Sequence, residues 1–271
     1  MGIYQNKMTK VITVANQKGG VGKTTTAVNL ATALSTIPKK ILLIDLDPQG
    51  NASTGFGISP SKRKLNSYSI FLNKVSSRDA IQGTEVPGLY IIPANNDLSA
   101  FAVEISNMEN REYLLRNVIQ NEFSDFDYVF IDTPPTLGLL TINSLVACNS
   151  VLIPTQCEFY AMEGLAQLLK TIQRIQQNFN KQLGIQGIVL TMADRRSNLS
   201  VHVESEVREH FKELVYATVV PRNVKVSEAP SFGKPVLLYN YKCPGSQSYV
   251  QLAKEFLDRE RLILGERENN G

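Results

Sequence analysis

A glycine-rich loop near the start of the chain constrains the fold more than any other feature. It follows the apolar, β-branched run 11–15, precedes the helical pattern 23–35, and reads Lys18, Gly19, Gly20, Val21, Gly22, Lys23, Thr24, Thr25. Glycines let backbone N–H groups converge on an anion, and the start of a helix adds the positive end of its dipole. The order strand, glycine loop, helix therefore predicts a phosphate-binding site.

The remainder of the chain alternates strand patterns with helical patterns. The expected strands are 11–15, 41–44, 89–92, 128–131, 150–153, 187–190 and 216–220. The expected helices are 23–35, 111–122, 139–147, 163–180, 199–211 and 248–264. Most strand runs are apolar throughout, as in a parallel sheet covered on both faces. The pattern predicts an α/β fold with a doubly wound, mostly parallel sheet and helices on both faces.

Length and composition favour one domain. The chain has 271 residues, of which 43% are hydrophobic, and its net charge is only +3. We expect a short N-terminal extension over 1–9, a single P-loop ATPase domain over 10–264 and a polar tail over 265–271. The polar stretch 59–77 is interpreted as a loop with short helices. Apolar runs fall short of the roughly 20 residues that span a bilayer, so a cytoplasmic protein is expected.

Cysteine and histidine usage argues against several site classes. The cysteines Cys148, Cys157 and Cys243 lack CxxC spacing, which argues against a structural zinc site or a disulfide framework. Only two histidines, His202 and His210, are present, and both are expected on the surface of a helix. We therefore do not expect imidazole-based metal binding or catalysis.

The two lysines of the glycine loop differ in their expected roles. Lys23 is placed to reach the β- and γ-phosphates, and the Thr24 hydroxyl to bind the magnesium ion that bridges them. The usual pattern needs glycine at position 17, where this chain has Gln17, and Lys18 instead opens the loop. This K-G-G-x-G-K-T-T pattern resembles the deviant Walker A family of ParA, MinD and the nitrogenase iron protein. The resemblance implies ATP and Mg²⁺ as ligands, and an ATP-dependent homodimer in which Lys18 reaches the partner subunit's phosphates.

Three aspartates are candidate partners of that magnesium ion. Asp45 and Asp47 follow the strand 41–44, where period two places them on one side; taken alone they could equally cap a turn. The sequence D-x-D-P-Q-G-N resembles switch I of ParA proteins, which implies that Asp47 orients the attacking water and contacts the magnesium shell, with Asp45 supporting it. Asp132 ends the apolar run 128–131 in the Walker B manner, and its D-x-P-P continuation resembles the family's switch II.

The last third of the chain carries the expected adenine and DNA contacts. Residues 220–234, VPRNVKVSEAPSFGK, closely resemble chromosomal ParA (Soj) proteins, which implies that Pro221 and Asn223 contact the adenine. Basic residues in or near these loops are Arg195, Arg196, Arg222, Lys225, Lys234 and Lys242. Composition alone favours a solvated surface. The resemblance instead implies a patch that binds DNA without sequence preference and becomes continuous across the dimer, so that more phosphates are neutralised.

Three related functions compete for this ATPase site. An iron protein is excluded because Cys148 and Cys157 lie off that family's cluster pattern. A MinD-type protein needs a basic C-terminal helix, but 254–268 holds four basic and five acidic residues. That helix is expected to dock on the domain through Val250, Leu252, Ala253, Phe256 and Leu257. A regulator that uses ATP only as a switch stays open, whereas a helix-turn-helix extension before the loop is not expected.

The sequence is thus identified as a member of the ParA/Soj group of partitioning ATPases. The resemblance implies weak intrinsic ATP hydrolysis, stimulation by a ParB-type partner, DNA binding without membrane binding, and a cytoplasmic, nucleoid-associated location. Whether the cargo is a chromosome, a plasmid or a protein cluster stays open.

Overall fold

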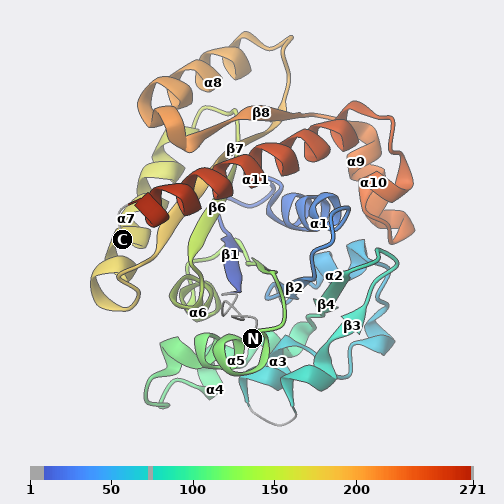
Figure 1. The fold of residues 1–271 in the computed structure, drawn as a ribbon, viewed down its shortest axis with the longest axis vertical. Coiled ribbons are helices and arrows are strands. Elements are labelled where there is room, and N and C mark those ends of the chain that lie inside the picture. Colours follow the sequence, from blue (N-terminus) through green and yellow to red (C-terminus); the bar gives the residue numbers. More distant parts are fainter. Residues whose placement is uncertain (1–8, 73–75, 270–271) are drawn as a thin grey trace.

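One eight-stranded sheet organises the computed structural model, which describes residues 9–72 and 76–269 and side chains as far as Leu262. The strand order is β3-β4-β2-β5-β1-β6-β7-β8 (Figure 1). The strands are β1 Lys10–Val14, β2 Ile41–Asp45, β3 Gln82–Gly83, β4 Leu89–Ile92, β5 Tyr128–Asp132, β6 Ser150–Gln156, β7 Gly184–Ala193 and β8 Val215–Pro221. Only β3 pairs antiparallel, so the mostly parallel sheet is confirmed.

Both faces of the sheet are apolar. In β2, Leu42 and Ile44 pack into one hydrophobic cluster while Ile41 and Leu43 pack into another, and all four are fully buried. Successive side chains of a strand point to opposite faces, so a strand covered on both sides must be apolar at every position. This is why the strand runs read as continuous rather than alternating.

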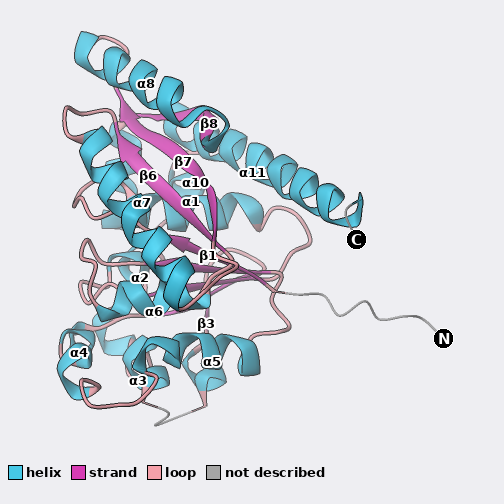
Figure 2. Cartoon of the chain, turned by 90° about the vertical axis from the view of Figure 1, so that its left-hand side faces the viewer, coloured by secondary structure: helices cyan, strands magenta, loops and turns pink. Residues whose placement is uncertain are grey.

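Helices cover the two faces in separate groups (Figures 1 and 2). The cluster containing Ile41 also takes side chains from α1 Lys23–Leu34, α10 Val236–Tyr239 and α11 Pro244–Asn269. The opposite cluster takes side chains from α5 Leu114–Glu122, α6 Leu139–Ala147, α7 Ala161–Asn178 and α8 Asn198–Phe211. The predicted doubly wound arrangement is therefore confirmed.

The C-terminal helix docks on the domain as expected. Leu252, Ala253 and Phe256 are buried in the same cluster as α1, with Val250 and Leu257 packed at its edge. The helix begins four residues before the predicted start and runs to Asn269, so its backbone continues through most of the predicted tail. Among the described residues, no helix is both long and apolar enough to cross a membrane.

Several short elements were not predicted. They are β3, α2 Asn51–Gly55, α4 Phe101–Glu104, α9 Val224–Glu228 and α10, whereas α3 Ser67–Phe71 falls in the stretch 59–77 where short helices were expected. Each is too short to show a hydrophobic period. Thr9 donates to the carbonyls of Phe123 and Phe126, so packing begins one residue before Lys10, while residues 1–8 of the predicted extension lie outside the described residues.

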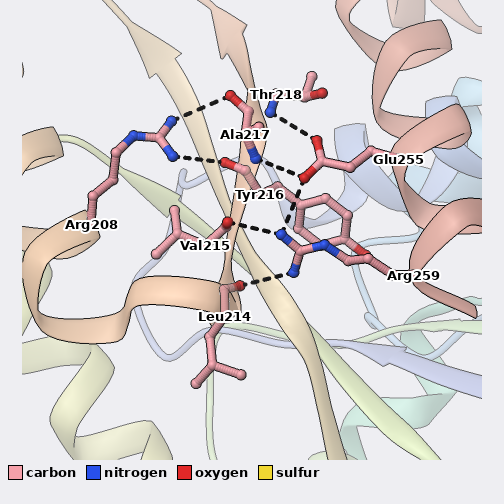
Figure 3. A network of polar contacts seen from close by, with 8 residues as sticks. All are labelled: Arg208, Leu214, Val215, Tyr216, Ala217, Thr218, Glu255 and Arg259. Carbon is pink, nitrogen blue, oxygen red and sulfur yellow. Dashed lines mark hydrogen bonds and ion pairs between the residues drawn. The ribbon is translucent and has the colours of Figure 1, made fainter. Parts of the chain in front are cut away.

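Charged side chains cover the exposed edge of the sheet (Figure 3). β8 is the edge strand, and its pairing with β7 is irregular, with Ile188 opposite Val215 but Leu190 opposite Val219. The intervening backbone groups bond to Arg208 of α8 and to Glu255 and Arg259 of α11. Filling the hydrogen-bonding groups of an edge strand in this way prevents pairing with another sheet.

Candidate nucleotide site

Three strand ends bring the predicted acidic residues together. β5 lies between β2 and β1, and its last residue, Asp132, pairs in register with Asp45 on one side and Val14 on the other. The Asp132 carbonyl also accepts a hydrogen bond of 2.9 Å from the Leu46 amide. Asp132 therefore lies directly between the Asp45 strand end and the strand that leads into the glycine loop.

The glycine loop takes the backbone conformation that an anion cradle needs. Gly20 and Gly22 have φ angles of 75° and 84°, a region that side chains with a Cβ rarely adopt. Gly22 immediately precedes α1 and brings no capping side chain, so the first amides of α1 stay available to a ligand. The Lys23 ammonium donates to the Lys18 carbonyl at 3.2 Å. The loop is preformed for phosphate.

Lys23 lies near the acidic strand ends. Burial lowers the pKa of Lys23, while the charges of Asp132 and Asp47 oppose that shift. The side chain is 7% exposed. A largely buried ammonium beside two carboxylates gives the site a cation matched to phosphate oxygens and a set of acids matched to magnesium.

Asp45 and Asp47 differ in their contacts. Asp45 accepts hydrogen bonds from the Asp47 amide and from the amide and hydroxyl of Ser53, at 2.7 to 3.1 Å. Asp47 accepts one bond from the Gln49 amide, at 2.9 Å. Burial raises the pKa of Asp45 to about 6, against the effect of the Ser53 bonds. Asp45 thus fixes the turn that carries Asp47, while its supporting role toward magnesium stays a prediction.

Asp132 differs from the other two aspartates in having no hydrogen bond to its carboxylate among the described residues. It is fully buried, and neither of its oxygens has a hydrogen-bond partner among the described residues. Burial and the Asp45 charge raise its pKa well above the usual range; the Thr24 hydroxyl opposes this without reaching hydrogen-bond geometry. A buried acid without partners is costly and indicates a missing ligand. A magnesium ion held by Asp132, Thr24 and nucleotide phosphates fits these residues.

The acids form no cage of their own. No group of three or more His, Cys, Asp or Glu side chains in the described part of the chain is arranged to hold a metal ion. Mg²⁺ commonly keeps several waters and binds through one or two carboxylates plus substrate phosphates. The site therefore suits a metal that arrives with a nucleotide better than a resident structural ion.

Lys18 forms an ion pair within its own chain. Its ammonium contacts the Glu158 carboxylate, which follows the end of β6, and its amide donates to the Asn16 side chain at 3.0 Å. Asn16 in turn donates to the Pro154 carbonyl at 2.7 Å. Both charged side chains are partly exposed, at 37% for Lys18 and 45% for Glu158. Lys18 is therefore free to exchange Glu158 for another partner.

The residues predicted to contact adenine lie at the end of β8 and in the turn that follows it. Pro221 ends β8, and the Asn223 side chain accepts from the Lys225 amide at 3.0 Å as the N-cap of α9. Between them and the glycine loop lies β7, whose Thr191 hydroxyl donates to the Val21 carbonyl at 2.8 Å. The roles of Pro221 and Asn223 toward adenine stay predictions.

Of the basic residues predicted to bind DNA, only the three arginines lie together. Arg195, Arg196, Arg222 and Pro221 line one hollow of about 590 Å³ between the ends of β7 and β8. The Arg196 guanidinium donates two hydrogen bonds of 2.9 Å to Asp194. These bonds lower the pKa of Asp194 to about 2.

The three lysines lie apart from that hollow. Lys225 is paired with Glu228 at 2.9 Å, Lys234 lies 4.0 Å from Glu85, and Lys242 is exposed. The cysteines are free and buried, and both histidines lie on the surface of α8, as expected.

Four residues with a part in the site were missed at the sequence level. They are Ser53, Arg63, Glu158 and Thr191. Ser53 follows the switch I pattern closely enough to have been proposed. The other three reach the site from distant segments, and no local pattern marks them.

Known proteins similar to this chain agree with the geometry. A family model described as an AAA domain matches residues 9–185. The chain is 52% identical over 254 residues to the chromosome partitioning protein ParA of Caulobacter vibrioides, covering 93% of this chain and 95% of the relative. It is 48% identical over 248 residues to the sporulation initiation inhibitor protein Soj of Bacillus subtilis, covering 92% and 98%. The chain belongs to the ParA/Soj family.

A solved structure extends the comparison to the fold. Cobyrinic acid a,c-diamide synthase from Mycobacterium smegmatis, crystallised with ADP and magnesium, matches with a TM-score of 0.82 and 35% identity. The match covers 94% of this chain and 96% of that one. Membership of the ParA/Soj family confirms the resemblance predicted from the glycine loop, switch I and residues 220–234, and the shared P-loop fold confirms the predicted fold class.

Proposed function

We propose that this ParA/Soj family member is a DNA-partitioning ATPase. It binds ATP with Mg²⁺, forms a sandwich dimer, binds DNA without sequence preference, and releases it after hydrolysis that a ParB-type partner stimulates. It acts in the cytoplasm on the nucleoid. The observation that carries this proposal is the buried Asp132 carboxylate, which has no hydrogen-bond partner within 9–72 and 76–269, next to Lys23 and Thr24 of the loop.

Each group of the site has a step in this proposal. Amides of the glycine loop and Lys23 would hold the phosphates, while Thr24 and Asp132 would hold the magnesium ion. Asp47, on the turn fixed by Asp45, orients the attacking water and contacts the metal's water shell. Magnesium supplies charge neutralisation when bound. Hydrolysis then depends on where these side chains point rather than on covalent chemistry of the protein.

Dimerisation enters the proposal through Lys18. In the sandwich dimer Lys18 leaves Glu158 and neutralises charge on the partner subunit's phosphates, as an arginine finger supplied in trans does. The partial exposure of both side chains supports such an exchange, because an exposed pair contributes little stability. ATP binding and assembly are thereby coupled.

DNA binding is proposed for the basic hollow at the ends of β7 and β8, together with Lys225, Lys234 and Lys242 outside it. Arg195 and Arg222 are exposed on its rim, whereas Arg196 and Lys225 must first leave acidic partners. Doubling the number of phosphate contacts in the dimer raises affinity steeply and makes it dependent on salt. Arg222 is the most informative single residue of the patch.

DNA retention with and without Mg-ATP tests the proposal. Wild-type protein should retain DNA only with Mg-ATP, and Arg222→Glu should reduce retention about tenfold or more at moderate salt because a phosphate contact becomes a repulsion. Arg174→Glu, a charge reversal on the exposed face of α7, is the matched control and should retain DNA normally. Retention that ignores ATP, or nucleotide-dependent binding to anionic liposomes instead of DNA, would contradict the proposal.

A further inference from the structure

Arg63 is a buried cation that the proposed reaction does not use. Its side chain comes from the segment after the short helical turn Pro60–Lys62, and the residue is 6% exposed. The guanidinium donates to the Ile58 carbonyl at 2.7 and 3.0 Å, to the Thr54 hydroxyl at 2.8 Å and to the Ala94 carbonyl at 3.4 Å. All of these acceptors are neutral. Burial lowers the pKa of Arg63, and the charge of Asp45 offsets this only in part. A cation bonded to neutral oxygens is costly to bury, so a functional reason is expected.

The guanidinium lies against the turn that carries Asp47. A Cβ placed on Gly50 would lie 2.1 Å from the Arg63 Nη1 atom, so the two groups approach closely only because position 50 has no side chain. The Gly50 amide closes the turn by donating to the Asp47 carbonyl at 2.8 Å, and its φ is 61°. The Gly50 carbonyl accepts from the Thr54 amide and hydroxyl at 3.0 Å. Arg63 thus lies against both ends of the segment 50–54, at Gly50 and at Thr54.

The same guanidinium joins this segment to the sheet. Ala94 lies just beyond β4, and its amide donates to the Ser53 hydroxyl at 3.0 Å, which in turn donates to Asp45. Arg63 adds a second connection from the switch segment to the Ala94 carbonyl. The segment from Asp47 to Ile58 is therefore fastened to the β4 end by one neutral and one cationic group.

We propose that Arg63 is a positioning residue for hydrolysis, whose guanidinium, packed over Gly50 and bonded to Thr54, Ile58 and Ala94, holds the Asp47 turn in its water-orienting position. The proposal rests on the function proposed for Asp47. It explains why an arginine is buried here, because a planar fork holds Thr54, Ile58 and Ala94 in one fixed geometry, whereas an ammonium is a point charge on a flexible stem. A small displacement of a group that orients the reacting water lowers the rate steeply.

Arg63→Lys tests the role while keeping the charge. Single-turnover hydrolysis with protein in excess should fall about 10–100-fold, while the Kd for ATP changes less than about threefold, because only water placement is affected. Arg208→Lys is the matched control, since Arg208 also bonds backbone carbonyls, at the sheet edge. Arg208→Lys should lower the melting temperature about as much as Arg63→Lys does, but its rate of hydrolysis should not change.

A second variant reaches the same contact from the other side. Gly50→Ala should displace the guanidinium and reduce hydrolysis with little change in ATP affinity. Gly88→Ala is the control. Gly88 has a similar backbone conformation (φ 78°), and a Cβ added there would lie 3.1 Å from the Lys39 carbonyl at the opposite end of the sheet. This variant should hydrolyse ATP at the wild-type rate.

Two results would overturn the proposal: wild-type rates in Arg63→Lys or Gly50→Ala, or losses no larger than those of their controls. Absence of ATP hydrolysis by the wild-type protein would instead overturn the proposed function itself.

Discussion

Two carboxylates differ in their hydrogen bonding: the buried Asp132 on the central strand β5 and the half-buried Glu255 on α11. Glu255 accepts from the Ala217 and Thr218 amides at 2.7 and 2.9 Å and from Arg259 at 3.1 Å (Figure 3). Burial alone would raise the pKa of Glu255, but these amides and the Arg259 cation lower it overall. Asp132 has no such bonds among the described residues, and its pKa is raised.

The difference separates structural charge from functional charge. A carboxylate whose lone pairs are filled by the protein stabilises the fold and leaves no room for a ligand. A carboxylate that accepts no hydrogen bond from the protein costs free energy of folding and persists where a ligand binds it. Removing the two charges should therefore have opposite effects on stability and on activity.

The largest expected effect is that of Asp132→Asn. Hydrolysis of Mg-ATP should fall about 100-fold or more, because the metal loses a carboxylate where phosphate charge is neutralised. The ligand-free protein should at the same time unfold at a higher temperature, since the amide replaces a carboxyl that ionises freely when unfolded but whose ionisation burial opposes in the folded state. Hydrolysis rates and thermal melts measure both. A melt below that of the wild type would show that Asp132 has a stabilising partner.

The next effect is a dependence of stability on pH. Folded Asp45 has a pKa of about 6, and that of Asp132 is also raised, so both bind protons more tightly when folded. The contribution of each is therefore greatest below the unfolded pKa of about 4; that of Asp45 is lost as pH rises through about 6, and that of Asp132 is lost as pH rises through its own raised pKa. In urea titrations of the ligand-free protein, the stability advantage of Asp132→Asn over wild type should widen between about pH 5 and pH 8. A constant difference would argue against a raised pKa.

The smallest effect is that of Glu255→Ala. Loss of its bonds should lower the free energy of unfolding by about 1 kcal/mol, because water reaches the exposed Ala217 amide and replaces part of the bonding. ATP hydrolysis per folded molecule should not change. Asp258→Ala, on the same helix but exposed, is the control and should change stability less. An activity loss in Glu255→Ala would break the separation between the two regions.

The sequence predicted the parts of this comparison unequally. Asp132 was predicted because it ends a continuous apolar run, and strand ends of a parallel sheet share one edge. Its lack of partners was not, since that depends on how Thr24 and Asp45 face it after folding. Glu255 and Arg208 lie on predicted helices, but their bonds to β8 follow from an irregular register that no local pattern reveals.

The same limit applies to Arg63 and to the short elements. Residues 59–77 were expected to form a polar loop with short helices; the structure confirms short helices with a turn at Pro60–Lys62 and α3, while residues 73–75 lie outside the described residues. Nothing local indicated that the Arg63 guanidinium would be buried over Gly50. Helix α2 has five residues, fewer than two turns, so no hydrophobic period could announce it.

The most direct test of the central claim is the gain in ATP affinity that magnesium brings, measured by calorimetry for the wild-type protein and for Asp132→Asn. If the Asp132 carboxylate serves a metal that arrives with the nucleotide, magnesium should tighten wild-type binding about tenfold or more, and most of this gain should disappear in Asp132→Asn. An equal gain in both proteins would contradict the account.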